Sequence, residues 1–173
     1  MGSMRTSDLL VDGFGRIREE VHGAVAGLST GQLAERLDSD ANSIAWLCWH
    51  LTRVQDDHAA DAFGVSQVWQ QPQWAEWSER FGLSTLDTGY GHSSRQVAHV
   101  RAPGSLLTSY YDAVHEQTIS LVSKVADDDL DRIVDTRWDP PVSLGVRLIS
   151  VISDCLQHAG QAAFIRGILQ RRR

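Results

Sequence analysis

The chain has 173 residues and a formal net charge of −6; hydrophobic residues make up 42% of it and charged residues 22%. This is the composition of a soluble globular protein with one domain, which we place at residues 4–173, after a short cloning remnant at residues 1–3. The acidic balance gives no electrostatic reason to expect nucleic-acid binding, and no apolar run is long enough to span a membrane.

Four amphipathic segments of about twenty residues predict four long helices. The first runs from Thr6 to about Leu28, with apolar residues at three- and four-residue steps. The second runs from Ser43 to about Phe63 and stops at Gly64, a residue that suits the position just after a helix. The third and fourth run from Gly104 to about Val125 and from Ser143 to about Leu169.

The connections between these helices are short, with one exception. Residues 64–103 are rich in turn formers and tryptophan, and predict one or two short helices within a long crossover connection. Residues 132–141 predict an extended arm that ends at two prolines. Because almost no strand signal is present, we predict an all-α fold, a four-helix bundle with a long crossover connection.

The two cysteines, Cys48 and Cys155, lie inside predicted helices rather than at spaced loop positions. This argues against a disulfide framework and favours a reducing cytoplasm. A thiolate at Cys155 would be a good zinc ligand or nucleophile. A helical cysteine in an apolar stripe is more often a small buried hydrophobe, and we predict that role for both.

Three residues on two helices form a candidate metal site. Asp154 and His158 are four residues apart and therefore project from the same face of the last helix. His50 lies in the most apolar stretch of the chain, on the second helix. If these helices pack together, two imidazoles and a carboxylate converge, and three N/O ligands with one open position are typical of a catalytic divalent-metal site.

An ordinary interpretation of the same residues is that His50 is a core histidine bonded to a backbone carbonyl. Asp154 and His158 would then be a simple ion pair on one helix. Spacing alone favours this interpretation, because such pairs recur on helices by chance. The apolar placement favours the metal site, because burying both imidazoles beside a carboxylate is costly unless something pairs them.

Asp57 and His58 follow His50 on the second helix and are candidate catalytic residues. Asp57 could accept a hydrogen bond from the free ring nitrogen of a metal-binding histidine and so orient it, or it could contact substrate. His58 could orient a ligand or itself bind the metal. The alternative is a solvated helix end, with Asp56 and Asp61 pointing outward.

Gln161 and Arg166 are two further candidates on the last helix. Gln161 lies one turn past His158 and could donate a hydrogen bond to a substrate or a metal-bound water. Arg166 lies two turns past His158 and could bind an anionic group of a substrate. Surface placement is the ordinary alternative for both residues.

Two segments of the chain resemble the DinB-like superfamily of metal-binding four-helix bundles. One is Ser43 to His58, which includes Ile-Ala-Trp-Leu-Cys-Trp-His, and the other is Asp154-Cys-Leu-Gln-His158-Ala-Gly-Gln161. The resemblance covers essentially the whole chain. The superfamily includes mycothiol-dependent maleylpyruvate isomerases and thiol S-transferases. The resemblance implies that His50 and a pair of residues one turn apart on the fourth helix bind a divalent metal, often zinc or nickel. That pair is His and His in many members and Glu and His in the isomerases, so Asp154, shorter than glutamate by one methylene, departs from the pattern.

The resemblance implies a metal-dependent transferase or isomerase that uses a metal-activated thiolate, with mycothiol as the thiol and a small molecule as substrate. One alternative is a metal-dependent hydrolase that activates water. Another is a non-catalytic, stress-related protein that binds metal or a partner. We also expect a homodimer, since bundles with Trp-rich connections often pair, and we expect neither a nucleic acid nor a membrane as partner.

Overall fold

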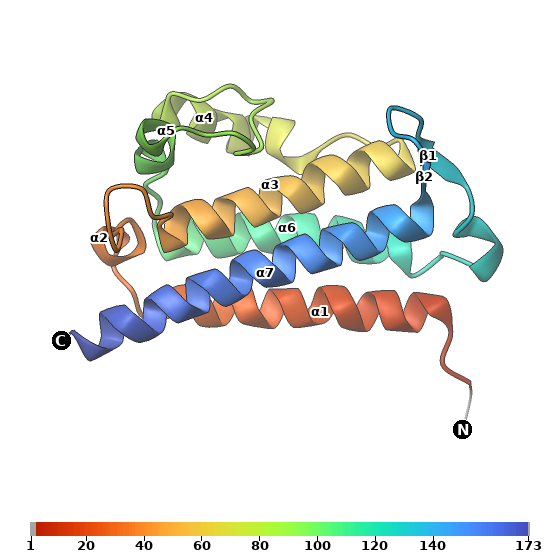
Figure 1. The fold of residues 1–173 in the computed structure, drawn as a ribbon, viewed down its shortest axis with the longest axis horizontal. Helices are drawn as coiled ribbons and strands as arrows, with labels where there is room; N and C mark the ends of the chain where they lie inside the picture. The colour runs from red at the N-terminus through yellow and green to blue at the C-terminus, as the bar shows by residue number, and fades with distance from the viewer. Residues whose placement is uncertain (1–2, 173) are drawn as a thin grey trace.

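The computed structural model describes residues 3–172, so Met1 and Gly2 of the predicted cloning remnant lie outside it. Four long helices form the bundle: α1 (Thr6–Val25), α3 (Ile44–Phe63), α6 (Gly104–Val122) and α7 (Leu144–Arg171). Helices α6 and α7 each pack against both α1 and α3, so that α1 and α3 lie across the bundle from one another (Figure 1). The predicted all-α bundle is confirmed. No helix in the described part of the chain is both long and apolar enough to cross a membrane.

Local capping explains where the predicted helices begin and end. The hydroxyl of Ser43 accepts a hydrogen bond from the first turn of α3, and Ser143 does the same for α7. Gly64 ends α3 in the left-handed conformation, with a φ of 66°. The first predicted helix was three residues too long, because the chain turns sharply at Gly27, where φ is 70°.

The long connection from α3 to α6 is a crossover, because these two helices run in the same direction (Figure 1). It contains the 3-10 turn η1 (Val68–Gln70) and the short helices α4 (Pro72–Phe81) and α5 (Ser94–His99), as predicted. The connection covers the side of α3 that faces away from the bundle, so α3 is buried on nearly every side.

A buried ion pair attaches the start of the crossover to α3. Asp56 is only 1% exposed and accepts hydrogen bonds from the backbone N–H groups of Val68 and Trp69, both at 2.8 Å. It also accepts from the Tyr110 hydroxyl at 2.9 Å and from the Arg53 guanidinium at 3.3 Å. Asp56 is therefore not an outward residue of a solvated helix end, because the crossover folds over it.

The remaining elements are short. Helix α2 (Thr30–Leu33) lies between α1 and α3, and the 3-10 turn η2 (Asp127–Asp129) follows α6. The predicted extended arm folds back on itself as a small antiparallel hairpin of β1 (Ile133–Asp135) and β2 (Val142–Ser143). The hairpin lies where α3 ends and α7 begins (Figure 1), and its loop carries Trp138.

Candidate metal centre and cavity

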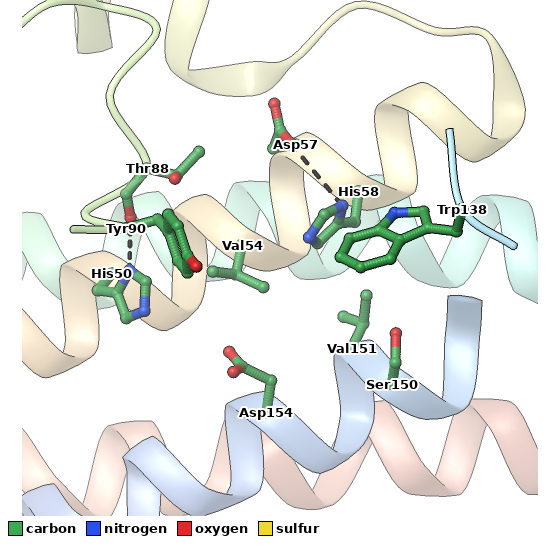
Figure 2. A pocket seen from close by; sticks show the side chains of 10 residues that line it. All are labelled: His50, Val54, Asp57, His58, Thr88, Tyr90, Trp138, Ser150, Val151 and Asp154. Atoms are coloured by element: carbon green, nitrogen blue, oxygen red, sulfur yellow. Dashed lines mark hydrogen bonds and ion pairs between the residues drawn. The ribbon is translucent and has the colours of Figure 1, made fainter. Parts of the chain in front are cut away.

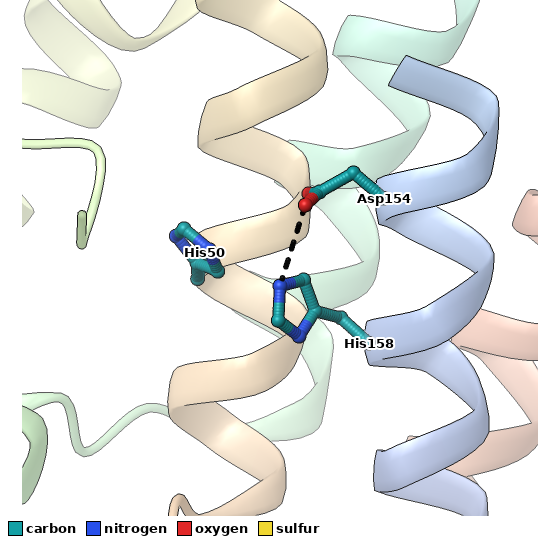
Figure 3. Close-up of side chains that lie close together, drawn as sticks. All are labelled: His50, Asp154 and His158. Atoms are coloured by element: carbon teal, nitrogen blue, oxygen red, sulfur yellow. Dashed lines mark ion pairs between the residues drawn. The ribbon is translucent and has the colours of Figure 1, made fainter. Parts of the chain in front are cut away.

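The structure brings His50, Asp154 and His158 together where α3 packs against α7 (Figure 3). One ligand atom from each side chain lies within 4.8 Å of the other two. His158 Nε2 is 3.7 Å from Asp154 Oδ1, and the rings of His50 and His158 meet edge to face with centroids 4.8 Å apart. Bonds of about 2.0–2.2 Å to one ion require ligand atoms within about 4 Å of one another, so the three side chains lie near the spacing that an ion would need.

The second carboxylate oxygen of Asp154 provides a test of whether a cation fits. Although 41% of the side chain is exposed, Oδ2 is shielded from solvent and has no hydrogen-bond partner within residues 3–172. A shielded carboxylate oxygen without a partner is costly, and a cation relieves that cost. Two imidazoles and one carboxylate are ligands that suit Zn²⁺ or Ni²⁺, so the residues present fit such an ion.

His50 is oriented by the crossover loop. Its Nδ1 lies 2.5 Å from the carbonyl oxygen of Thr88, and because a carbonyl only accepts hydrogen bonds, Nδ1 carries the proton. The lone pair is therefore on Nε2, which is the nitrogen available to a metal. Burial lowers the pKa of His50, which favours the neutral imidazole that ligation requires. Trp46 stacks on the ring at 4.6 Å and limits its rotation.

Thr88 can approach His50 so closely because the next residue is glycine. Gly89 has a φ of 97°, and a Cβ built there would lie 2.6 Å from His50 Nδ1. The sequence of this segment predicts only a turn. The available signal was the pair of glycines in Thr-Gly-Tyr-Gly, where a residue with positive φ allows the backbone to approach a side chain.

Gln161 lies beside His158, one turn further along α7. Its Oε1 is 3.2 Å from His158 Nδ1, and an amide oxygen accepts, so Nδ1 of His158 is the protonated nitrogen. The other nitrogen, Nε2, then faces Asp154. The structure thus places Gln161 where it can orient a candidate ligand, a contact different from the two given above, a substrate or a metal-bound water.

Arg166 lies outside this group of residues. Its guanidinium donates hydrogen bonds to the backbone carbonyls of Ala24 and Ala26, at 3.3 and 2.5 Å, where α1 ends. A cation at that position satisfies carbonyls that the helix leaves unpaired. The predicted role in binding an anionic group of a substrate has no counterpart in this placement.

A cavity of about 620 Å³ opens beside the three candidate ligands, between α3, α7 and two loops (Figure 2). Asp57 and His58 line it together with His50 and Asp154, so the structure brings the two predicted α3 residues to the same cavity. Two exposed aromatic residues also line it: Tyr90 from the crossover loop, 94% exposed, and Trp138 from the hairpin loop, 66% exposed. Neither residue could be predicted to line the cavity from its position in the sequence, because only the folded loops bring them to α3 and α7.

Neither cysteine supplies a thiolate to the cavity. Both are buried and unpaired as thiols, as predicted, and Cys155 donates to the carbonyl oxygen of Leu51 at 3.4 Å. Burial raises the pKa of Cys48 to about 12 and that of Cys155 well above its usual value. Any thiol that reacts here near neutral pH must therefore come from outside the chain.

Comparisons with known proteins agree with this fold. A conserved protein from Enterococcus faecalis, known from its crystal structure, superimposes with a TM-score of 0.82 at 27% sequence identity, over 95% of this chain and 96% of that one. The comparison with curated proteins gives no match. The family model for mycothiol S-transferases matches residues 9–170, nearly the whole chain, and agrees with the DinB-like resemblance. The chain therefore belongs to the mycothiol S-transferase family.

Proposed function

We propose that this protein is a metal-dependent transferase that attaches mycothiol, a low-molecular-weight thiol, to an electrophilic small molecule. Family membership supports the thiol and the reaction class. The observation that carries the metal dependence is the shielded, unpartnered Oδ2 of Asp154 beside the imidazoles of His50 and His158.

In this proposal His50, Asp154 and His158 hold a zinc or nickel ion at the inner end of the cavity. A divalent cation lowers the pKa of a thiol bound to it, so that a thiolate is available near neutral pH. The protein orients the two imidazoles through Thr88 and Gln161, which fixes the nitrogen that each presents. The buried cysteines do not compete for the ion, because their thiols stay protonated.

The rest of the cavity binds the two reactants. Tyr90 and Trp138 offer flat apolar surfaces at its exposed side, on which rings of the thiol or the electrophile can stack. Asp57 is held in place by Gln67, whose amide donates to Oδ1 at 2.7 Å, and its other oxygen remains available to a polar group of the thiol. With an alkyl halide as electrophile, the sulfur bonds to carbon, the halide leaves with its electron pair, and the thiol proton passes to solvent.

Metal content and conjugation are measured together on full-length protein purified without chelator or a metal-affinity column. We expect about one zinc or nickel per chain by plasma mass spectrometry. We also expect a thioether by mass spectrometry when mycothiol and an alkyl iodide are supplied, and loss of the thioether on chelation. His158→Ala should lose both metal and activity. His99→Ala, an exposed histidine on α5, is the matched control and should retain both.

Two outcomes would overturn the proposal. Substrate that is hydrolysed at the same rate with and without thiol would identify a hydrolase that activates water. Protein without stoichiometric metal, whose metal content does not change in His158→Ala, would identify a non-catalytic member of the family.

A further inference from the structure

His58 lies on the cavity wall, and its two ring nitrogens have different surroundings. The residue is eight positions beyond His50 on α3, about 12 Å along the helix axis. A thiol held at the metal centre would lie between the two histidines, and an electrophile that meets its sulfur lies on the His58 side. Both histidines line the same cavity, so in the proposed function the His58 end of the cavity is left to the second reactant.

The Nδ1 atom of His58 accepts a hydrogen bond from Arg147. The guanidinium Nη1 of Arg147 lies 2.8 Å from Nδ1, and a guanidinium can only donate. Asp57 Oδ2, the nearest carboxylate oxygen, is 3.8 Å from the same nitrogen, which is too far for a hydrogen bond. The imidazole is therefore neutral, with its proton on Nε2. In Figure 2 the other ring nitrogen faces the cavity on the side of Val54.

Arg147 is itself fixed in this position. The residue is 7% exposed, and its Nη2 donates a hydrogen bond to Asp135 Oδ2 at 2.6 Å. This contact joins α7 to the hairpin. Asp135 in turn accepts three hydrogen bonds from Arg137: from the backbone N–H at 2.9 Å and from the guanidinium at 2.9 and 2.8 Å. The buried guanidinium thus has a fixed carboxylate on one side and the imidazole on the other.

We propose that Arg147 is a positioning residue that holds His58 as the neutral Nε2–H tautomer, so that His58 donates a hydrogen bond to an oxygen of the electrophile. This rests on the proposed transferase function and identifies its preferred substrates, beyond alkyl halides, as electrophiles whose carbonyl or ether oxygen gains charge during attack. A neutral imidazole is suited to this task, because it polarises such an oxygen without giving up its proton.

With an α,β-unsaturated ketone, the thiolate sulfur bonds to the β-carbon and the π electrons move onto the carbonyl oxygen. The oxygen accepts the His58 hydrogen bond as its charge grows. The α-carbon then takes from solvent the proton that the thiol released, so the addition is balanced without a further reactant. Burial and the Arg147 charge both lower the pKa of His58, and Asp57, Asp61 and Asp154 oppose them.

The tautomer is measured directly, without metal or substrate, by two-bond nitrogen–proton correlation on uniformly ¹⁵N-labelled full-length protein at neutral pH. The spectrum of His58→Gln assigns the His58 signals among the seven histidines. We expect a protonated Nε2 and an unprotonated Nδ1. A protonated Nδ1, or an imidazolium, in the unmodified protein overturns the proposal whatever the activity measurements show.

Arg147→Met tests the cause. Without the guanidinium, the proton should move from Nε2 to Nδ1, which can then donate to Asp57. Nε2 thereby changes from a hydrogen-bond donor to an acceptor. Arg137→Met is the matched control: it removes another arginine bound to Asp135 that has no hydrogen bond to His58, and should leave the tautomer unchanged. A tautomer that stays the same in Arg147→Met, or that changes equally in both variants, contradicts the assignment to Arg147.

Two electrophiles distinguish positioning from a general structural role. We expect Arg147→Met to lower kcat with an α,β-unsaturated ketone by about 10–100-fold, the usual effect of losing the partner that orients a functional side chain. With an alkyl iodide, which has no oxygen to polarise, kcat of the variant should stay within about threefold of that of the unmodified protein. An equal loss of kcat with both electrophiles would overturn the role of His58 as a donor. If the unmodified protein forms no conjugate at all, the transferase function is overturned and the tautomer result still stands.

Discussion

Gly89 lies directly against the imidazole of His50, and a Cβ at residue 89 would come within 2.6 Å of His50 Nδ1. The backbone of the crossover loop therefore acts as part of the site. It supplies the Thr88 carbonyl that orients His50, and it can do so only where no side chain intervenes.

Gly89→Ala should destabilise the protein and weaken metal binding. The positive φ costs about 1–3 kcal/mol for a residue with a side chain, and the new methyl group must displace His50 as well. Gly91→Ala is the control, since Gly91 also has a positive φ of 71° but open space around it. Urea unfolding and metal titration should show a loss of stability in both variants and a loss of metal affinity only in Gly89→Ala. Equal metal affinity in the two variants would contradict the role of the loop.

Asp154 supplies the carboxylate of the candidate metal site. Asp154→Asn removes the charge without changing the shape, and should reduce metal affinity by more than the roughly 10–100-fold that loss of an outer partner costs. Asp154→Glu should retain the ion, because its carboxylate reaches further. Competition with a chromogenic chelator measures both, with Glu20→Gln, an exposed carboxylate on α1, as the control. Unchanged affinity in Asp154→Asn would remove Asp154 from the ligand set.

Gln161 is expected to act through His158. Gln161→Leu removes the acceptor from His158 Nδ1 and should lower metal affinity about 10–100-fold, because the imidazole is then free to rotate or change tautomer. Gln161→Glu supplies an acceptor of the same reach and should restore most of the affinity. If both variants bind metal as the unmodified protein does, Gln161 has no orienting role.

Asp56 should be among the most important polar side chains for stability. Asp56→Ala leaves the buried Arg53 guanidinium without its carboxylate partner. It also leaves the backbone N–H groups of Val68 and Trp69 without an acceptor. We expect the free energy of unfolding to fall by about 3–5 kcal/mol in urea titrations. Asp61→Ala, an exposed aspartate on the same helix, should change it by no more than about 0.5 kcal/mol. A small effect at Asp56 would mean that the crossover is held mainly by apolar contacts.

Acid should destabilise the metal-free protein from about pH 6.5 downward. Burial is the first cause that lowers the pKa of each of four histidines: His50, His58, His92 and His115. As the pH falls, the unfolded chain takes up these protons first, so the free energy of unfolding decreases until the folded chain is protonated as well. Urea unfolding with chelator present, at about pH 5 to 8, measures the slope, and His115→Gln should reduce it. A stability that is flat or rises toward low pH would contradict the prediction.

The helices and the Asp154–His158 pair could be predicted from the sequence because they depend on neighbours within one or two helical turns. Ser43, Gly64 and Ser143 mark helix ends through hydrogen bonds and backbone conformations that are local. The apolar run around His50 indicated a buried imidazole, since burial follows from hydrophobic content.

The partners of these residues were decided only by the tertiary structure. Thr88 reaches His50 across 38 positions of the chain, and Arg147 reaches His58 across 89. Arg166, which spacing alone placed near the site, binds the end of α1 instead. Such contacts depend on how helices rotate and loops close against one another, and a periodic pattern along one helix holds no information about the partner it will meet.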